Sequence, residues 1–363
     1  MAMSRTTTIV ALVLVSSLSS VFIHVEGDAH DASYSFERDG QNTVAFDGQT
    51  ARLKMADELY DALNSNESTT EGLIKQFTEG SPNLIGKVGT GCLKEENKAI
   101  GDKLTDMIKD YGDNVIPAWN TPAADGSPGE LSDEIRTLQV NSKGWELDQT
   151  FQKALIGALT LDQIVNNYLQ PCKLDADGKT EDNTNGVMAE GKPYTSMEHA
   201  WDEAFGYLYG QEPDATADLS SPGGAGTLLN KYLKKVSAGD VAPGISEPIF
   251  KAFVKGRQAI VDGDYETRDA QAKIIQENLS KVIGAMTINY LKSYLSKKND
   301  SPADAIHALS EGYGFMLSLP FTNNGAGEPY MSQEVVDAIL PNYENFWTVK
   351  DDAVEAHINE IVT

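Results

Sequence analysis

The chain has 363 residues, with 54 Asp and Glu against 29 Lys and Arg, which gives a formal net charge of −25. A surface this acidic repels nucleic acid and anionic lipid, and no dense basic segment offsets it, so neither is expected as a partner. After residue 27 no apolar run is long enough to cross a bilayer, so no transmembrane segment is expected.

Residues 1–27 have the features of a cleaved export signal. Arg5 precedes an apolar run from Ile9 to Ile23, and small residues follow at the usual cleavage spacing, ending at Gly27. The sequence therefore predicts a signal peptide over 1–27 and a mature chain over 28–363. We expect the mature protein to be periplasmic or secreted.

The chain contains two cysteines, Cys92 and Cys172. In an oxidising compartment such a pair favours one disulfide, and closing a loop of this length adds about 4 kcal/mol of stability in the chain-entropy model. Neither cysteine has a CxxC partner or a nearby histidine in the sequence, which disfavours thiol catalysis and zinc ligation. We predict a structural disulfide.

Helical periodicity dominates the sequence. The stretch ARLKMADELYDALN (51–64), for example, puts Leu53, Leu59 and Leu63 on one face. Gly, Pro and Asp separate such stretches, and no segment alternates with period two for long enough to require a sheet. The pattern predicts an all-α protein of about ten helices. They fall near 51–64, 96–112, 145–170, 196–209, 226–237, 246–262, 267–298, 302–318, 332–346 and 351–361.

A short motif occurs twice. Residues 199–208 read HAWDEAFGYL and residues 307–316 read HALSEGYGFM, so both follow H-A-x-x-E-x-aromatic-G-aromatic-apolar. Each copy uses one of only five histidines and lies on a helix-forming segment. We interpret the copies as equivalent parts of two packed helical-bundle repeats, over about 46–219 and 228–363.

On a helix, each copy places its histidine and glutamate one turn apart on the same face. The glycine that follows one turn later permits the close approach of another helix or a ligand. If a pseudo-twofold axis relates the repeats, the two faces can converge, and imidazole and carboxylate ligands from facing helices can hold a metal ion. The alternative is a local His–Glu contact with no further role. The candidate metal ligands are His199, Asp202, Glu203, His307 and Glu311.

Two isolated cations, Arg52 and Arg257, lie on helical patterns in this acidic chain. Either could neutralise a buried acid inside the bundle. An exposed ion pair, worth under about 1 kcal/mol, is the expectation for both.

The segments GQTARLKMADEL (48–59) and YTSMEHAWDEAFGYL (194–208) resemble a bacterial family, domain of unknown function 4856, which is similar to the imelysins. The resemblance extends over most of the mature chain. It implies a helical fold of two bundle-like repeats, export, and a histidine–acid motif near the repeat interface. Imelysin-like proteins are linked to iron uptake and were classed as metallopeptidases.

The imelysin pattern is Gly-x-His-x-x-Glu, and this chain departs from it. His199 matches the histidine, Asp202 stands at the position of the glutamate, and Met197 stands at the position of the glycine. The resemblance therefore leaves open whether Asp202 or Glu203 carries out the family's role.

The leading hypothesis is a non-enzymatic, exported binding protein that captures a metal ion or a metal-bearing compound in a cleft between the repeats. Iron is favoured by the resemblance alone, because zinc, manganese and copper accept the same ligands. An uptake partner at the cell surface would be part of such a system, and the sequence does not identify it.

Two alternatives remain open. The first is a metal-dependent hydrolase in which His199 and His307 hold the metal ion and Glu203 acts as the base. Neither a His-Glu-x-x-His run nor a G-x-S-x-G elbow occurs in the sequence, which disfavours the familiar peptidase and esterase classes. The second is a structural surface protein in which the His–Glu pairs only orient helices.

Overall fold

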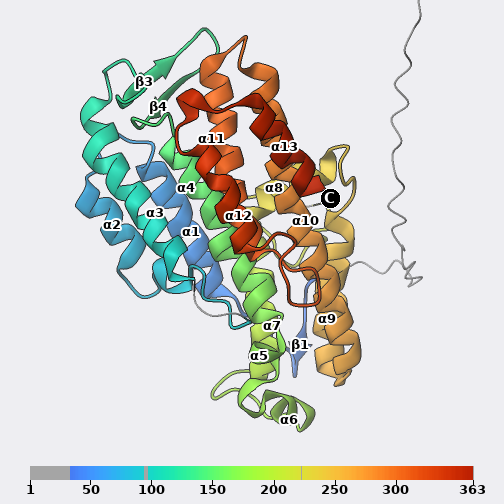
Figure 1. Cartoon of the computed structure of the whole chain (residues 1–363). Helices are drawn as coiled ribbons and strands as arrows, with labels where there is room; N and C mark the ends of the chain where they lie inside the picture. The colour runs from blue at the N-terminus through green and yellow to red at the C-terminus, as the bar shows by residue number, and fades with distance from the viewer. Residues whose placement is uncertain (1–32, 94–96, 222, 363) are drawn as a thin grey trace, which may run out of the picture. The chain divides into compact units, whose positions relative to one another are not determined.

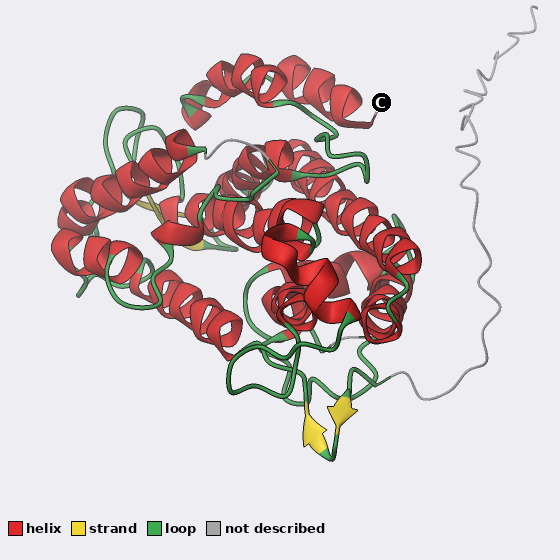
Figure 2. Cartoon of the chain, turned by 90° about the horizontal axis from the view of Figure 1, so that it is seen from below, coloured by secondary structure: helices red, strands yellow, loops and turns green. Residues whose placement is uncertain are grey.

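The structure is a computed structural model that describes residues 33–93, 97–221 and 223–362, and helices dominate these ranges (Figures 1 and 2). The predicted all-α class is confirmed. The predicted signal peptide, 1–27, lies outside the described residues. None of the described helices is both long enough and apolar enough to span a membrane. The helices are α1 (Asp47–Ala62), α2 (Thr70–Thr78), α3 (Lys98–Asp110), α4 (Leu147–Leu155), α5 (Pro171–Leu174), α6 (Lys179–Thr184), α7 (Ser196–Tyr209), α8 (Leu229–Ala238), α9 (Ser246–Asp262), α10 (Tyr265–Lys297), α11 (Pro302–Ser318), α12 (Gln333–Ile339) and α13 (Asp351–Val362).

The centre of the fold is a buried helical rod. It consists of α4 and two π-helical segments that continue it, η4 (Ile156–Leu161) and η5 (Ile164–Tyr168). Every residue from 146 to 170 is buried, and α10 and α11 pack along the rod. π-Helical turns often occur near functional sites because they shift side chains out of the regular helical register.

The sequence pattern predicts the long helices better than the short elements. The predicted ranges 196–209, 246–262 and 302–318 coincide with α7, α9 and α11. Two antiparallel hairpins, β1 (Glu37–Arg38) with β2 (Gln41–Asn42) and β3 (Gly129–Ser132) with β4 (Thr137–Val140), were not predicted. Strands of two to four residues contain too few alternations to give a period-two signal.

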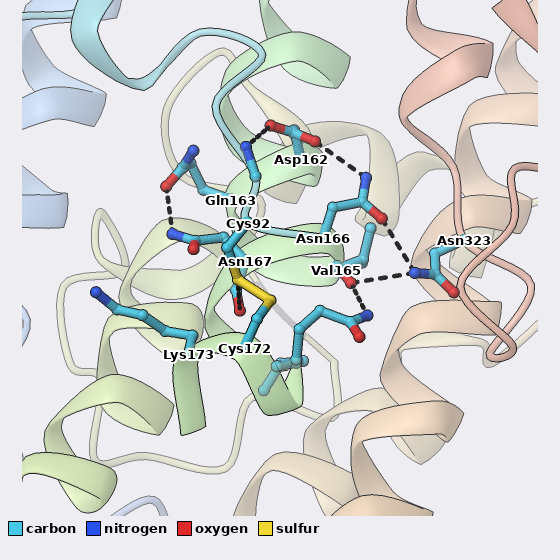
Figure 3. Close-up of a disulfide and its surroundings, with 12 residues drawn as sticks. Cys92, Asp162, Gln163, Val165, Asn166, Asn167, Cys172, Lys173 and Asn323 are labelled. Carbon is cyan, nitrogen blue, oxygen red and sulfur yellow. Dashed lines mark hydrogen bonds between the residues drawn. A yellow bond between two sulfur atoms is a disulfide. The ribbon is translucent and has the colours of Figure 1, made fainter. Parts of the chain in front are cut away.

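The predicted disulfide between Cys92 and Cys172 is present, with the two Cα atoms 6.1 Å apart. It joins the loop after the 3-10 turn η1 (Ile85–Lys87) to α5, just beyond the end of the rod (Figure 3). Buried polar groups surround it. Asp162 accepts hydrogen bonds from the backbone N–H of Gly91 at 2.8 Å and from the amide of Asn166 at 3.0 Å. The disulfide therefore fixes this loop against an already hydrogen-bonded part of the rod.

Candidate functional site

The first copy of the motif lies on α7, which starts with a capping box. Thr195 accepts a hydrogen bond from the backbone N–H of Glu198 at 3.2 Å, and the Glu198 carboxylate accepts one from the backbone N–H of Thr195 at 2.7 Å. The glycine of this copy, Gly206, faces the start of α1. A Cβ atom on Gly206 would lie only 2.4 Å from Cβ of Phe46, so the predicted close approach of another helix is confirmed.

Asp202 is buried in an ion-pair network that we call the Arg257 network: Arg38, Glu198, Asp202 and Arg257. Nε of Arg257 donates to Oδ1 of Asp202 at 2.9 Å, and Nη1 donates to Glu198 at 3.0 Å. Tyr34 donates its hydroxyl to Oδ1 of Asp202 at 2.7 Å. Burial raises the pKa of Asp202 to about 6, although Arg257 and Tyr34 oppose the rise.

The expectation of an exposed ion pair is wrong for Arg257, whose side chain is 0% exposed. It neutralises two buried carboxylates, which was the alternative left open by the sequence. A buried guanidinium needs hydrogen-bond acceptors for its donors, and Glu198, Asp202 and Thr43 provide them. The network therefore has the character of a structural element.

The other two candidates on α7 have separate surroundings. Oε1 of Glu203 accepts hydrogen bonds from Gln49 at 2.8 Å and from the hydroxyl of Tyr168 at 3.1 Å. The His199 ring stacks on the ring of Tyr194, with centroids 4.8 Å apart, and its buried Nδ1 has no hydrogen-bond partner among the described residues. The three candidate ligands on α7 thus contact three different sets of neighbours.

The second copy of the motif, on α11, belongs to a cluster of charged groups that we call the His307 cluster: Glu146, Asp148, Lys153, His307 and Glu311. Nδ1 of His307 lies 2.6 Å from Oε2 of Glu146, and Nε2 lies 3.3 Å from Oε2 of Glu311. The Lys153 ammonium lies 3.1 Å from Oε1 of Glu311. Three of the five residues come from the rod or from the residue before it, and two come from α11.

Burial gives the His307 cluster unusual electrostatics. Lys153 is 2% exposed and Asp148 is 4% exposed. Burial, followed by repulsion from Glu146, raises the pKa of Asp148 to about 7. Burial also acts to raise the pKa of Glu311, but Lys153 and His307 outweigh it and hold that pKa below its ordinary value. Each desolvated charge lowers the stability of the fold by several kcal/mol unless it is paired. Apolar residues of similar size would therefore give a more stable core at this place. Such clusters are candidates for functional sites.

The second glycine has the same role as the first. A Cβ atom on Gly314 would lie 2.6 Å from the backbone oxygen of Thr150 and 2.6 Å from Cβ of Lys153. The absence of a side chain at Gly314 lets α11 approach α4 closely. This approach brings His307 and Glu311 to the acidic start of the rod.

The structure brings His307 and Glu311 into contact. It does not link them to the candidates on α7, because no hydrogen bond or ion pair joins the two motif copies within 33–93, 97–221 and 223–362. In the same ranges no group of three or more His, Cys, Asp or Glu side chains is arranged to hold a metal ion. The metal assignment therefore stays a prediction. Sequence reasoning missed Glu146, Asp148 and Lys153, although their concentration at the start of a long helical pattern was a signal.

The fold is mostly helical, and two of its helices carry the motif. One of them belongs to a structural ion-pair network, and the other belongs to a buried cluster of acids and bases. The chain belongs to the family described as Domain of unknown function (DUF4856), whose family model matches residues 31–85 and 91–363. The resemblance found in the sequence is confirmed at the level of this family. No curated protein and no solved structure gives a significant match to the chain.

Proposed function

We propose that the protein is an exported, non-enzymatic binding protein that captures a metal ion, and that the His307 cluster is its binding centre. The observation that carries the proposal is that the carboxylates of Glu146 and Glu311 both contact the imidazole of His307, and that a further buried carboxylate, Asp148, interacts with Glu146. Imidazole and carboxylate together suit iron, zinc, manganese and copper.

The charge balance of the cluster favours a cation as ligand. Among the described residues, Lys153 is the only lysine or arginine in direct contact with these three acids, through Glu311, while Lys231 and Lys235 interact with Glu311 at longer range. When all three acids are ionised, Glu146 and Asp148 have no lysine or arginine in direct contact in this desolvated site, which is unfavourable. A divalent cation would supply the missing charge. Without it, a proton retained on Asp148 partly relieves the imbalance.

Metal capture requires a local rearrangement. The two nitrogens of His307 each contact a different carboxylate, so the imidazole and the acids do not yet surround one point. A metal ion would replace one of these contacts. His307 is partly accessible, with 16% of its side chain exposed, so an ion can reach the imidazole without crossing the whole core.

The two-repeat arrangement is part of the proposal, and equivalent contacts support it. The backbone N–H of Ala45, two residues before α1, donates to Asp202 at 3.2 Å. The backbone N–H of Glu146, directly before α4, donates to Ser310 at 3.0 Å. Asp202 and Ser310 occupy the same position in the two motif copies, three residues after the histidine. The α1–α7 and α4–α11 pairs thus have the same kind of contact.

The proposals that the protein is exported and that its metal is iron are supported by observations outside the His307 cluster. The features of residues 1–27 support a signal peptide, and the Cys92–Cys172 disulfide is consistent with an oxidising, extracellular environment. The preference for iron, and an uptake partner at the cell surface, rest on the likeness of this family to imelysin-like proteins.

The test is a calorimetric titration of chelator-treated protein with Fe(II) under anaerobic conditions, and with Zn(II) and Mn(II). We expect one ion per chain to bind the wild type, and we expect Glu146→Gln to weaken binding at least 10-fold. Glu247→Gln is the matched control, because Glu247 is an exposed acid whose ion-pair partner among the described residues is Lys251. The proposal is wrong if no metal binds the wild type, or if both variants bind like it.

A further inference from the structure

A second group of charges surrounds Tyr168 at the end of the rod, and we call it the Tyr168 cluster: Arg52, Lys87, Tyr168, Lys173 and Glu203. The ammonium of Lys87 lies 5.6 Å from the centroid of the Tyr168 ring, and the ammonium of Lys173 lies 5.3 Å from it. Figure 3 shows the Lys173 side chain extending away from the disulfide. Tyr168 itself donates its hydroxyl to Glu203.

The cations of this cluster are close enough to repel one another. The pKa of Lys87 is lowered first by burial and then by Arg52 and Lys173, while Glu203 opposes the change. Among the described residues, the three cations therefore face one carboxylate, that of Glu203, which already accepts hydrogen bonds from Gln49 and Tyr168. This excess of positive charge occurs in a chain with a net charge of −25.

Three nitrogen atoms of this cluster lack acceptors, although Nη1 of Arg52 donates to the backbone oxygen of Gly48 at 3.4 Å. Neither the ammonium of Lys87 nor that of Lys173 has a hydrogen-bond acceptor or a salt-bridge partner among the described residues. The buried Nε of Arg52 likewise has no hydrogen-bond partner in those ranges. Half-buried donors without acceptors are unfavourable, and an external anion would satisfy them.

A similar arrangement of a tyrosine and two lysines lies beside α11, but its lysines differ from those at Tyr168 in their hydrogen-bond acceptors. The ammonium groups of Lys153 and Lys231 lie 5.7 and 5.8 Å from the ring centroid of Tyr232, whose hydroxyl is 3.5 Å from Glu311. There, however, Lys153 contacts Glu311 and donates to the side chain of Gln152. A tyrosine flanked by two lysines and bonded to the motif glutamate thus occurs twice. Beside Tyr232 one of the two lysines, Lys153, has acceptors, whereas beside Tyr168 neither lysine has one among the described residues.

We propose that Arg52, Lys87 and Lys173 bind a small multivalent oxyanion, either a phosphate or a polycarboxylate, beside the ring of Tyr168. Ammonium and guanidinium groups form strong, charge-assisted hydrogen bonds with such anions, and partial burial strengthens them. The −25 net charge disfavours anions at long range, so affinity depends on these three local cations. This inference does not depend on the metal proposal, since the two clusters share no residue.

The test is a calorimetric titration of metal-free protein with inorganic phosphate and, separately, with citrate, at low ionic strength. We expect one anion per chain to bind the wild type, and whichever of the two binds identifies the class of oxyanion. The double variant Lys87→Gln/Lys173→Gln should weaken binding at least 10-fold. Lys87→Arg/Lys173→Arg, which keeps both charges, should retain most of the affinity.

The matched control is Lys109→Gln/Lys251→Gln, which removes two exposed lysines that pair with Asp106 and Glu247 one turn away. It should bind the anion like the wild type. If the double Gln variant does not fold, the single variants Lys87→Gln and Lys173→Gln replace it, and each should weaken binding several-fold. The proposal fails if neither anion binds the wild type, or if the control loses as much affinity as the double variant. His307→Ala should leave anion binding unchanged, which separates this site from the metal proposal.

Discussion

Helices α7 and α11 carry the same motif in different environments, and one position of the motif differs in charge between them. Three residues after the histidine, α7 has Asp202 and α11 has Ser310. Asp202 adds a buried negative charge, and Arg257 neutralises it. Ser310 is neutral, and its hydroxyl accepts a hydrogen bond from the backbone N–H of Glu146. The copy with the additional acid, on α7, is therefore part of a structural ion-pair network. The copy without it, on α11, is part of a cluster in which His307 contacts two carboxylates.

The largest effect is expected from disrupting the Arg257 network. Arg257→Leu leaves the carboxylates of Glu198 and Asp202 buried without their shared cation, which should lower the free energy of unfolding by about 3–5 kcal/mol. Urea denaturation measures the loss. The control Lys251→Ala, which breaks an exposed pair, should cost under about 1 kcal/mol. A loss as small as that of the control would show that the network is not a structural element.

The two glycines allow a direct comparison of the helix contacts. Gly314→Ala would force a Cβ atom against the backbone of the buried rod, whereas Gly206→Ala would force one against Cβ of Phe46, a half-buried residue at the edge of α1 that can shift with the helix start. Overpacking costs about 1–3 kcal/mol, and we expect Gly314→Ala to be the more destabilising variant in thermal unfolding. On α10, Gly284→Ala meets no atom within 4 Å and should instead be neutral or stabilising. The reverse order of the two motif variants would contradict the packing described here.

The acids of the two regions should respond differently to pH. The pKa of Asp148 is raised to about 7, above that of the unfolded chain, so ionisation in the folded state lowers stability as pH rises from about 4 to 7. Asp148→Asn removes this loss. Relative to wild type, the metal-free variant should gain about 2–3 kcal/mol between pH 5 and pH 8. Asp202→Asn removes a smaller loss of the same sign, because the pKa of Asp202 is raised to about 6, but it weakens the pairing of Arg257 and should therefore destabilise the protein at both pH values. Denaturation curves at the two pH values test this, and a pH-independent difference for Asp148→Asn would refute it.

The sequence predicts the long helices well because their apolar period extends over several turns and clear caps mark their ends. The capping box at Thr195 and the serine cap at Ser301 fix the starts of α7 and α11. The short hairpin β3–β4 gives no comparable signal, because each strand has only four residues.

The candidate site is less predictable than the fold. The repeated motif identifies His307 and Glu311, but their partners come from a helix more than 150 residues earlier in the chain. In the rod, polar residues such as Gln149 and Lys153 are buried, whereas the same pattern usually marks a solvent-exposed face. Burial depends on which elements pack on every side, so Lys153 cannot be recognised as an interior charge from the sequence of its helix.

The most direct test of the account compares the two motif histidines. Chelator-treated wild-type protein, His307→Ala and His199→Ala are loaded with the same metal ion, dialysed, and analysed for metal content per chain. The account predicts that His307→Ala loses the bound ion and that His199→Ala retains it, because only His307 belongs to the acid-rich cluster. Equal loss in both variants, or loss only in His199→Ala, would contradict the assignment of the binding centre to α11.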